Sequence, residues 1–270
     1  MRRALIAAAA ALAAAAVPAA AQQPPTLVPG RLTVAVSLPF PGLQAGAVRP
    51  DGTVSYARGM EIDMVREIAT RLGFADVRFV NEPFFSRLLT AGPKSWDMAV
   101  AGVTITADRR ERVGFSRAYL DADQGVLIRR NLGTTPGTVA ALKPLQLCTE
   151  RNSTGYRLIR TVIRPDKAPL QAGNAQRLFG LLQSAKCDAA VYDSPVLGAE
   201  VASAPDRYGP LVGRLVTGEK YGIVFPKTST ALRGRVDGVV KQLVTDGTIR
   251  RLSTRWISTD VRRLPVIPAQ

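Results

Sequence analysis

Histidine is missing from this 270-residue chain, and cysteine occurs only twice. Without histidine, a Ser-His-Asp or Cys-His catalytic device is excluded, as is histidine-ligated haem. Two cysteines with no histidine cannot build a typical structural zinc site. The chain also lacks a Walker loop, a dinucleotide fingerprint and a calcium-loop pattern. We therefore expect a protein that holds neither a metal ion nor a cofactor.

Long hydrophobic runs are confined to the first residues. The cationic start "MRR" precedes "ALIAAAAALAAAAVPAAA", which ends in small residues before Gln22. This pattern predicts a secretory signal peptide at residues 1–21, and hence a periplasmic protein. A membrane anchor is the alternative. It is disfavoured because alanine is weakly apolar and no stop-transfer flank follows.

The charge is strongly positive, with a formal net charge of +15. A basic surface can indicate nucleic-acid binding. Here the arginines are scattered along the chain rather than clustered, and an exported protein meets little nucleic acid. We therefore expect no nucleic-acid partner.

Short apolar runs alternate with helical patterns in the first third of the chain. Strands are predicted at Leu32–Ser37, Val77–Val80 and Asp97–Gly102, and "GMEIDMVREIATRLG" has apolar residues at helical spacing. This alternation favours parallel strands with helical crossovers, in which ligands bind at the carboxyl ends of the strands. The residues just past the predicted strand ends are Ser37, Phe40, Gly102, Thr104 and Arg109.

A second alternating series follows, with strands at "LQLCTE" and "CDAAVYD". Two long extended runs, Asp123–Arg130 and Tyr221–Pro226, flank it and look like crossings between two lobes. We predict a first lobe at residues 31–123 and 221–270, with a second lobe inserted at residues 124–220.

Five segments in this order resemble a known family: "LTVAVSLPF", "GMEIDMVREIATRLGF", "WDMAVAGVTITADRRERVGFSRAYL", "CDAAVYDSPVLGAE" and "DGTIRRLSTRWIS". They are similar to the polar-amino-acid solute-binding proteins of bacterial ABC importers. The resemblance covers residues 31–258. It implies an α/β, two-lobe periplasmic binding protein of type II, in which each lobe is a mostly parallel sheet flanked by helices and a two-strand hinge joins them.

The resemblance also implies roles for individual residues. Arg109 matches the arginine that grips the ligand α-carboxylate, with Thr104, the backbone of Gly102 and Thr154 as its partners. Asp193 matches the carboxylate that takes the α-ammonium group, and Phe40 matches an aromatic residue that packs on the ligand. "NST" stands where the family usually has Gly-Thr-Thr, so an asparagine replaces a glycine at residue 152.

The chemistry of these residues suits a zwitterion, whose two charges must both be matched when water is removed. An arginine can take a carboxylate bidentately, and an aspartate can take an ammonium group. Plainer roles remain open. Arg109 could form a surface ion pair, Asp193 could only cap the helix that begins near Pro195, and Phe40 could be core. Asp63 and Trp256 are interpreted as structural.

Side-chain specificity depends on Arg87 in "FFSRLL". Acidic-amino-acid receptors have an arginine at a matching spacing, which favours glutamate or aspartate. An exposed helical arginine is the alternative. Basic-amino-acid receptors have an aspartate where this chain has Ser37, which argues against lysine, arginine or histidine.

Cys148 and Cys187 are predicted to form a disulfide. An even pair of cysteines in an oxidising compartment usually closes, and both lie in strands expected to be neighbours in a parallel sheet. The pattern also looks like that of some general amino-acid receptors. Two buried free thiols are the alternative, because cysteine packs as a small apolar residue.

The predicted function is capture of an acidic or polar amino acid and its delivery to the membrane permease of an ABC importer. We expect a monomer that is not an enzyme. Two alternatives stay open. A periplasmic dehydratase on the same scaffold would need a general acid in the cleft, for which Glu150 is the nearby candidate. A module that presents its ligand to a sensory receptor would have the same site.

Overall fold

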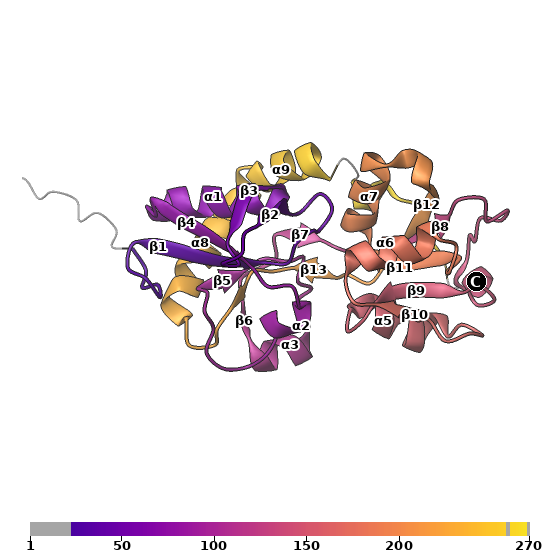
Figure 1. Cartoon of the computed structure of the whole chain (residues 1–270), viewed down its shortest axis with the longest axis horizontal. Helices are drawn as coiled ribbons and strands as arrows, with labels where there is room; N and C mark the ends of the chain where they lie inside the picture. The colour runs from indigo at the N-terminus through magenta and orange to yellow at the C-terminus, as the bar shows by residue number, and fades with distance from the viewer. Residues whose placement is uncertain (1–22, 258–259, 269–270) are drawn as a thin grey trace, which may run out of the picture.

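The computed structural model describes residues 23–257 and 260–268, and the predicted signal peptide at residues 1–21 lies outside them. Two α/β lobes lie side by side (Figure 1). The chain builds most of lobe 1, crosses to form lobe 2, and returns to lobe 1 for its last two α-helices, drawn in orange-yellow to yellow. The predicted two-lobe α/β architecture is confirmed.

Lobe 1 contains a five-stranded sheet in the order β4-β1-β5-β14-β6. Strands β1 (Arg31–Val36), β4 (Asp76–Asn81) and β5 (Met98–Ala99) run parallel. Strand β14 (Val224–Phe225) is antiparallel to β5 and to β6 (Gly114–Phe115). The sheet is therefore mixed, because the returning segment enters it in the opposite direction.

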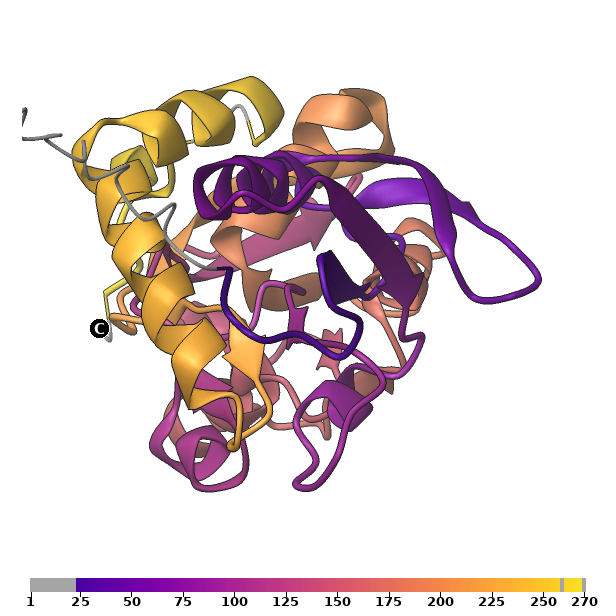
Figure 2. The same cartoon turned by 90° about the vertical axis from the view of Figure 1, so that its left-hand side faces the viewer.

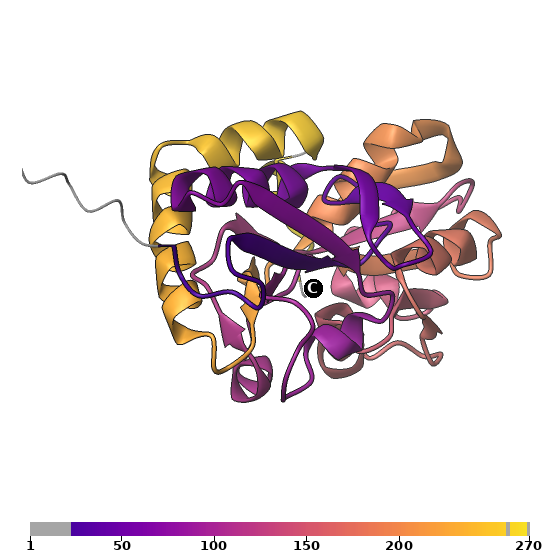
Figure 3. The same cartoon turned by 60° about the vertical axis from the view of Figure 1, so that its left-hand side comes forward.

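Helices α1 (Met60–Leu72), α8 (Thr230–Thr245) and α9 (Thr248–Trp256) pack on one another beside this sheet (Figures 2 and 3). Helix α1 follows the predicted periodicity, since its apolar positions are buried, and Gly73 ends it in a left-handed conformation. Trp256 Nε1 donates a hydrogen bond to Asp63 Oδ2 at 2.8 Å. This bond ties α9 to α1, which confirms the structural interpretation of both residues.

Three small elements complete lobe 1. Strands β2 (Ala45–Val48) and β3 (Val54–Arg58) form a hairpin that the sequence patterns did not indicate. Helices α2 (Phe85–Leu88) and α3 (Ala107–Arg112) are short. Helix α3 begins just beyond β5, so it lies where a ligand would be expected.

Lobe 2 has a five-stranded sheet in the order β10-β9-β11-β8-β12. Strands β9 (Leu147–Glu150), β10 (Leu170–Ala172) and β11 (Ala189–Asp193) are parallel. Strand β8 (Gln124–Arg129) is antiparallel to β11 and to β12 (Tyr208–Leu215). Three of the five strands thus follow the parallel expectation, and this sheet is mixed as well.

Short helical segments surround the second sheet. They are α4 (Val139–Leu142), α5 (Thr154–Leu158), the π-helical turn η1 (Ile159–Ile163), α6 (Ala175–Gln183), α7 (Ser194–Ser203) and the 3₁₀ turn η2 (Pro205–Arg207). Helix α5 starts just after β9, and α7 starts directly after β11. Both helices therefore begin at the carboxyl ends of parallel strands.

The hinge is a two-stranded antiparallel ladder between β7 (Leu120–Asp121) and β13 (Lys220–Tyr221). Strand β7 lies just before the first extended run predicted to cross between lobes, Asp123–Arg130, and β13 overlaps the start of the second, Tyr221–Pro226. Figure 1 shows both strands in the narrow region between the two sheets.

The C-terminal segment lies against lobe 2, beyond a last turn η3 (Val261–Arg263). Arg214 N donates to Pro265 O, and Ile267 N donates back to Arg214 O, both at 2.8 Å. Val139 N also donates to Pro268 O at 2.9 Å. The predicted boundaries assign these last residues to lobe 1, whereas their hydrogen bonds attach them to β12 and α4 of lobe 2.

A disulfide joins Cys148 on β9 to Cys187, which lies just before β11. The Cα atoms are 5.8 Å apart, within the usual range for a bridge. The two strands are parallel neighbours, with Ala190 opposite Cys148. The predicted pairing is confirmed, and the bridge lies wholly within lobe 2.

Candidate functional site

A small cavity lies between the lobes, where strand ends of the two sheets face each other. Six of the seven predicted ligand-binding residues line it: Phe40, Gly102, Thr104, Arg109, Thr154 and Asp193. The other lining residues are Phe85, Ala101, Glu150, Ser153 and Tyr192. Arg87 is not among them.

Arg109 projects into the cavity from α3. Its guanidinium donates to Thr104 O at 2.8 Å and, across the cleft, to Asn152 O at 3.5 Å, and it lies over the Phe85 ring at 5.3 Å from the centroid. The residue is only 7% exposed, and this burial lowers the pKa of Arg109, an effect that the charge of Asp193 opposes. Among the described residues, Arg109 forms no ion pair with a carboxylate. Its guanidinium is therefore available to an anionic group of a ligand, and the surface-ion-pair alternative has no support.

Gly102 brings the Phe40 ring close to the end of β5. Gly102 has φ +55°, and a Cβ added there would lie 2.5 Å from Phe40 Cε1. Phe40 in turn packs edge-to-face with Tyr192 from lobe 2, with centroids 6.3 Å apart. Phe40 thus lines the cavity as well as being buried in the core, so the two roles considered for it coexist.

Glu61 is hydrogen-bonded to the backbone just beyond the end of β5. Its carboxylate accepts hydrogen bonds from Gly102 N at 2.8 Å, from Gln44 Nε2, and from the Tyr119 hydroxyl. Burial raises the pKa of Glu61. The sequence pattern placed this residue only in the first turn of a helix, so its inward contacts were not foreseen.

Asp193 ends β11 and faces the cavity from lobe 2. Tyr221 Oη donates to its Oδ2 and Gln124 Nε2 to its Oδ1, both at 2.6 Å. Its carboxylate makes no capping hydrogen bond to α7, so a role limited to helix capping has no support. Burial, followed by the negative charge of Glu219, raises the pKa of Asp193 to about 6. A cationic group at this carboxylate would relieve both effects.

Glu219 is a further carboxylate at the site that the sequence did not indicate. Its Oε2 accepts hydrogen bonds from Thr154 Oγ1 at 2.7 Å and from Gln124 Nε2 at 3.0 Å. It lies in the irregular segment between β12 and the hinge strand β13, which has no recognisable motif. Only the folded hinge brings Glu219 to the first residue of α5.

Glu150 lies at the end of β9 and is 8% exposed. Tyr192 Oη donates to its Oε2 at 2.5 Å. Burial raises the pKa of Glu150 to about 7. The sequence indicated Glu150 only as a potential general acid. Glu150 ends a parallel strand as Asp193 does, so the strand-end rule could have indicated it as a cavity residue.

Arg87 lies on α2, outside the cavity. Its side chain is 64% exposed, with its guanidinium 3.8 Å from the Glu82 carboxylate and 4.6 Å from the centroid of the Phe84 ring. Ser37 does not line the cavity either. The two predictions of side-chain specificity rest on Arg87 and Ser37, and neither residue lines the cavity.

The two lobes touch beside the cavity. A Cβ added to Gly42 of lobe 1 would lie 2.5 Å from the Cβ of Ala199 on α7 of lobe 2. Arg157 of α5 also lies 4.0 Å from Asp108 of α3 across the cleft. The structure therefore has the closed arrangement of the lobes.

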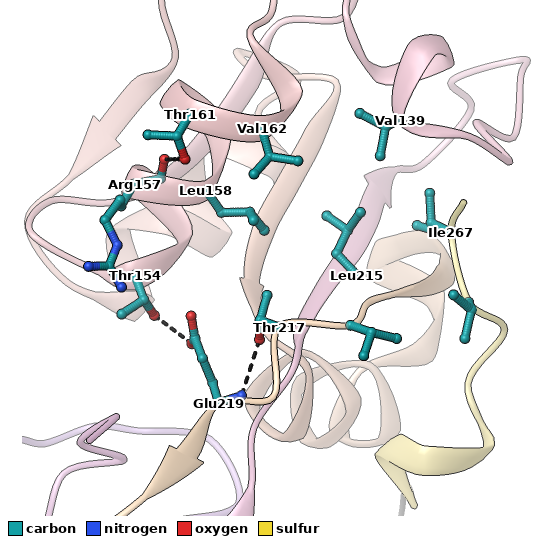
Figure 4. A pocket seen from close by; sticks show the side chains of 12 residues that line it. Val139, Thr154, Arg157, Leu158, Thr161, Val162, Leu215, Thr217, Glu219 and Ile267 are labelled. Atoms are coloured by element: carbon teal, nitrogen blue, oxygen red, sulfur yellow. Dashed lines mark hydrogen bonds between the residues drawn. The ribbon is translucent and has the colours of Figure 1, made fainter. Parts of the chain in front are cut away.

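A larger groove, of about 490 Å³, lies on lobe 2 next to this cavity (Figure 4). Leu158, Val162 and Leu215 form part of an apolar wall, and Glu219 closes one end by its bond to Thr154. Among the lining residues, the groove shares only Thr154 with the cavity. Of the two, only the smaller cavity is lined by buried groups of opposite charge, Arg109 and Asp193.

The family model for bacterial extracellular solute-binding proteins, family 3, matches residues 32–259. This chain belongs to that family. The match spans both lobes and the hinge, which confirms the family suggested by the sequence motifs.

Named relatives of this family-3 protein bind amino acids. The ABC transporter glutamine-binding protein GlnH of Bacillus subtilis is 28% identical over 205 residues, which cover 75% of this chain and 73% of the relative. A structure of holo ArgBP from T. maritima is 28% identical with a TM-score of 0.68, over 82% of this chain and 95% of that one. An ancestral arginine-binding protein bound to glutamine is 26% identical with a TM-score of 0.71, over 86% and 100%.

Within residues 23–257 and 260–268, no group of three or more Asp, Glu or Cys side chains could hold a metal ion. Within the same residues, no helix has the length and hydrophobicity needed to cross a membrane.

Proposed function

We propose that this family-3 protein captures a free α-amino acid between its lobes and delivers it to the membrane permease of an ABC importer. The observation that carries the proposal is a buried arginine and a buried aspartate lining one cavity from opposite lobes. Arg109 would take the α-carboxylate with Thr104, Thr154 and the backbone of Gly102. Asp193 would take the α-ammonium group. Phe40 would pack on the ligand.

The energetics of this arrangement suit a reversible carrier. Each charge-assisted hydrogen bond is worth roughly 1.5–3 kcal/mol net. Three or four such bonds, less the cost of ordering and association, correspond to about −8 kcal/mol and a micromolar dissociation constant. Because the two anchors belong to different lobes, the ligand stabilises the closed form, and hinge closure follows as a population shift.

Binding without chemical conversion is the function we favour, and a periplasmic dehydratase is the second candidate. Glu150 supports that candidate, because it is a buried carboxylic acid in the cavity with a pKa raised to about 7 by burial. Turnover assays with prephenate and arogenate separate the two. Product formation that Glu150→Gln abolishes would favour the enzyme.

The proposal is tested by a thermal-shift screen of the purified protein against the individual amino acids. A ligand at 100 times its dissociation constant should raise the unfolding free energy by about 2.7 kcal/mol. The same screen with Asp193→Asn should lose this stabilisation, because the ammonium group then has no charged partner. A screen in which no amino acid stabilises the wild-type protein would reject the proposal.

A further inference from the structure

The cavity contains more carboxylates than an ordinary amino acid can match. Asp193 and Glu150 line it, and Glu219 lies directly behind Thr154 and Gln124. Arg109 is the one lining cation in the described part of the chain. A zwitterionic ligand adds no net charge, so its α-groups can satisfy Arg109 and Asp193 while leaving Glu150 unmatched. Buried carboxylates are costly unless a positive partner is supplied.

One oxygen of the Glu150 carboxylate is held by a hydrogen bond, and the other is free within the described part of the chain. The Tyr192 hydroxyl holds Oε2, and this is the one hydrogen bond to the Glu150 carboxylate among the described residues. Oε1 therefore remains available to a donor in the cavity. The strand end, the short bond from Tyr192 and an exposure of only 8% hold the carboxylate in place in this closed arrangement.

Three aromatic side chains also line the cavity. Phe40 and Tyr192 meet edge-to-face across the cleft, and Phe85 lies under the Arg109 guanidinium. Aromatic faces together with a carboxylate form an environment that favours a desolvated cation, and a planar guanidinium in particular.

We propose that the ligand is an α-amino acid with a cationic side chain, and that Glu150 pairs with that side-chain cation. This inference rests on the proposed function, since Arg109 and Asp193 must hold the α-groups. It replaces the expectation of an acidic ligand, which depended on Arg87. It also differs from a basic-ligand site built on residue 37, because the selecting carboxylate comes from lobe 2.

The proposal predicts proton release on binding near pH 7. The groups that face Glu150 are Tyr192, Asp193 and Arg109. A cation placed beside the carboxylate favours its ionised form, so a fraction of a proton leaves with each ligand bound. Calorimetry in buffers of different ionisation enthalpy measures this fraction, and a neutral amino acid should release less.

The decisive experiment compares cationic ligands with neutral isosteres on matched variants. Calorimetry is run with arginine against citrulline and with lysine against norleucine. The proteins are wild type, Glu150→Gln, and Glu111→Gln as a control for removal of an exposed charge near α3. Wild type and the control should prefer each cationic ligand by at least about thirtyfold. Glu150→Gln should lose most of that preference and bind the neutral ligands within threefold of wild type.

Three other results would overturn either this proposal or the proposed function. Equal losses for cationic and neutral ligands in Glu150→Gln would overturn the proposal, because Glu150 would then serve the α-ammonium group shared by all amino acids. A wild-type preference for glutamate or for the neutral isosteres would also overturn it, while leaving amino-acid binding intact. Failure of every amino acid to bind wild type would instead reject the proposed function itself.

Discussion

The two lobes have similar mixed sheets but present opposite chemistry to the cavity. Lobe 1 contributes the buried guanidinium of Arg109 and backbone groups at the end of β5. Lobe 2 contributes the carboxylates of Asp193 and Glu150 at the ends of two parallel strands. A dipolar ligand can satisfy both faces only when the lobes are closed. The difference between the lobes therefore couples binding to closure.

The lobes also differ in how they are held together. Lobe 2 is built from short helices and carries the disulfide between β9 and the start of β11. Lobe 1 has no cysteine, and its helices α8 and α9 pack against α1. A cross-link stabilises mainly by restricting the unfolded chain, and here that restriction acts on lobe 2 alone.

Removal of the Arg109 guanidinium should have the largest effect on ligand affinity. Arg109→Ala should weaken amino-acid binding at least about a hundredfold, because the ligand carboxylate loses its buried charged partner. Arg112→Ala, an exposed arginine of the same helix, is the matched control and should bind as wild type. Calorimetry measures both. Binding by Arg109→Ala within threefold of wild type would show that the opposite charges of the two lobes do not determine ligand binding.

Removal of the cross-link should affect one lobe selectively. Replacing Cys148 and Cys187 together by serine should lower the unfolding free energy of lobe 2 by roughly 2–4 kcal/mol. Urea titration measures the loss, and hydrogen exchange locates it. We expect faster exchange at amides of β9 and β11 and little change in α1 of lobe 1. Equal acceleration in both lobes would show that they unfold as one cooperative unit.

The carboxylate face should make the ligand-free protein less stable as the pH rises. Burial raises the pKa of Glu150 from 4.5 to about 7, so folding retains its proton through a range where the unfolded chain has lost it. Its contribution is fully present below pH 4.5 and is lost as the pH rises to about 7, on the order of 3 kcal/mol at most.

Denaturant unfolding of wild type and Glu150→Gln between pH 4 and pH 8 measures this contribution. The variant should show a flatter dependence on pH across that window. A cationic ligand should flatten the wild-type curve as well, because it stabilises the ionised carboxylate. Identical curves for the two proteins would mean that Glu150 titrates alike in the folded and unfolded states.

Arg87 should have the smallest effect on binding. Arg87→Ala should change the affinity for every amino acid by less than threefold, because its side chain is exposed and lies outside the cavity. The earlier expectation of an acidic ligand predicts something different, namely a selective loss of glutamate and aspartate binding. Calorimetry with glutamate and glutamine decides between the two.

Much of the architecture follows from local patterns. The helical periodicity of α1 and its terminal Gly73 depend on neighbouring residues, so sequence predicts them well. The strand-end rule named Gly102 and Arg109, which line the cavity, because parallel strands bring their carboxyl ends to one edge. It also named Ser37, which does not line the cavity, whereas Asp193 was indicated by the family resemblance. The same rule gave no account of β8, which was recognised as extended but joins its sheet in the antiparallel direction.

The charge balance of the cavity could not be predicted from local sequence patterns. Glu219 and Tyr221 reach Asp193 or its partners from the hinge and Gln124 from the start of β8, and none belongs to a motif. Arg87 had the right spacing, yet its short helix α2 leaves it exposed.

The sequence by itself predicted the two-lobe α/β fold and the cysteine pair and, through the family resemblance, indicated Arg109 and Asp193 as candidate anchors, because each depends on periodicity, chain order or the chemistry of single residues. Only the tertiary structure decided which charged side chains are buried together. Burial, and with it the pKa of Glu150 and the availability of Arg109, is set by contacts between segments far apart in the chain.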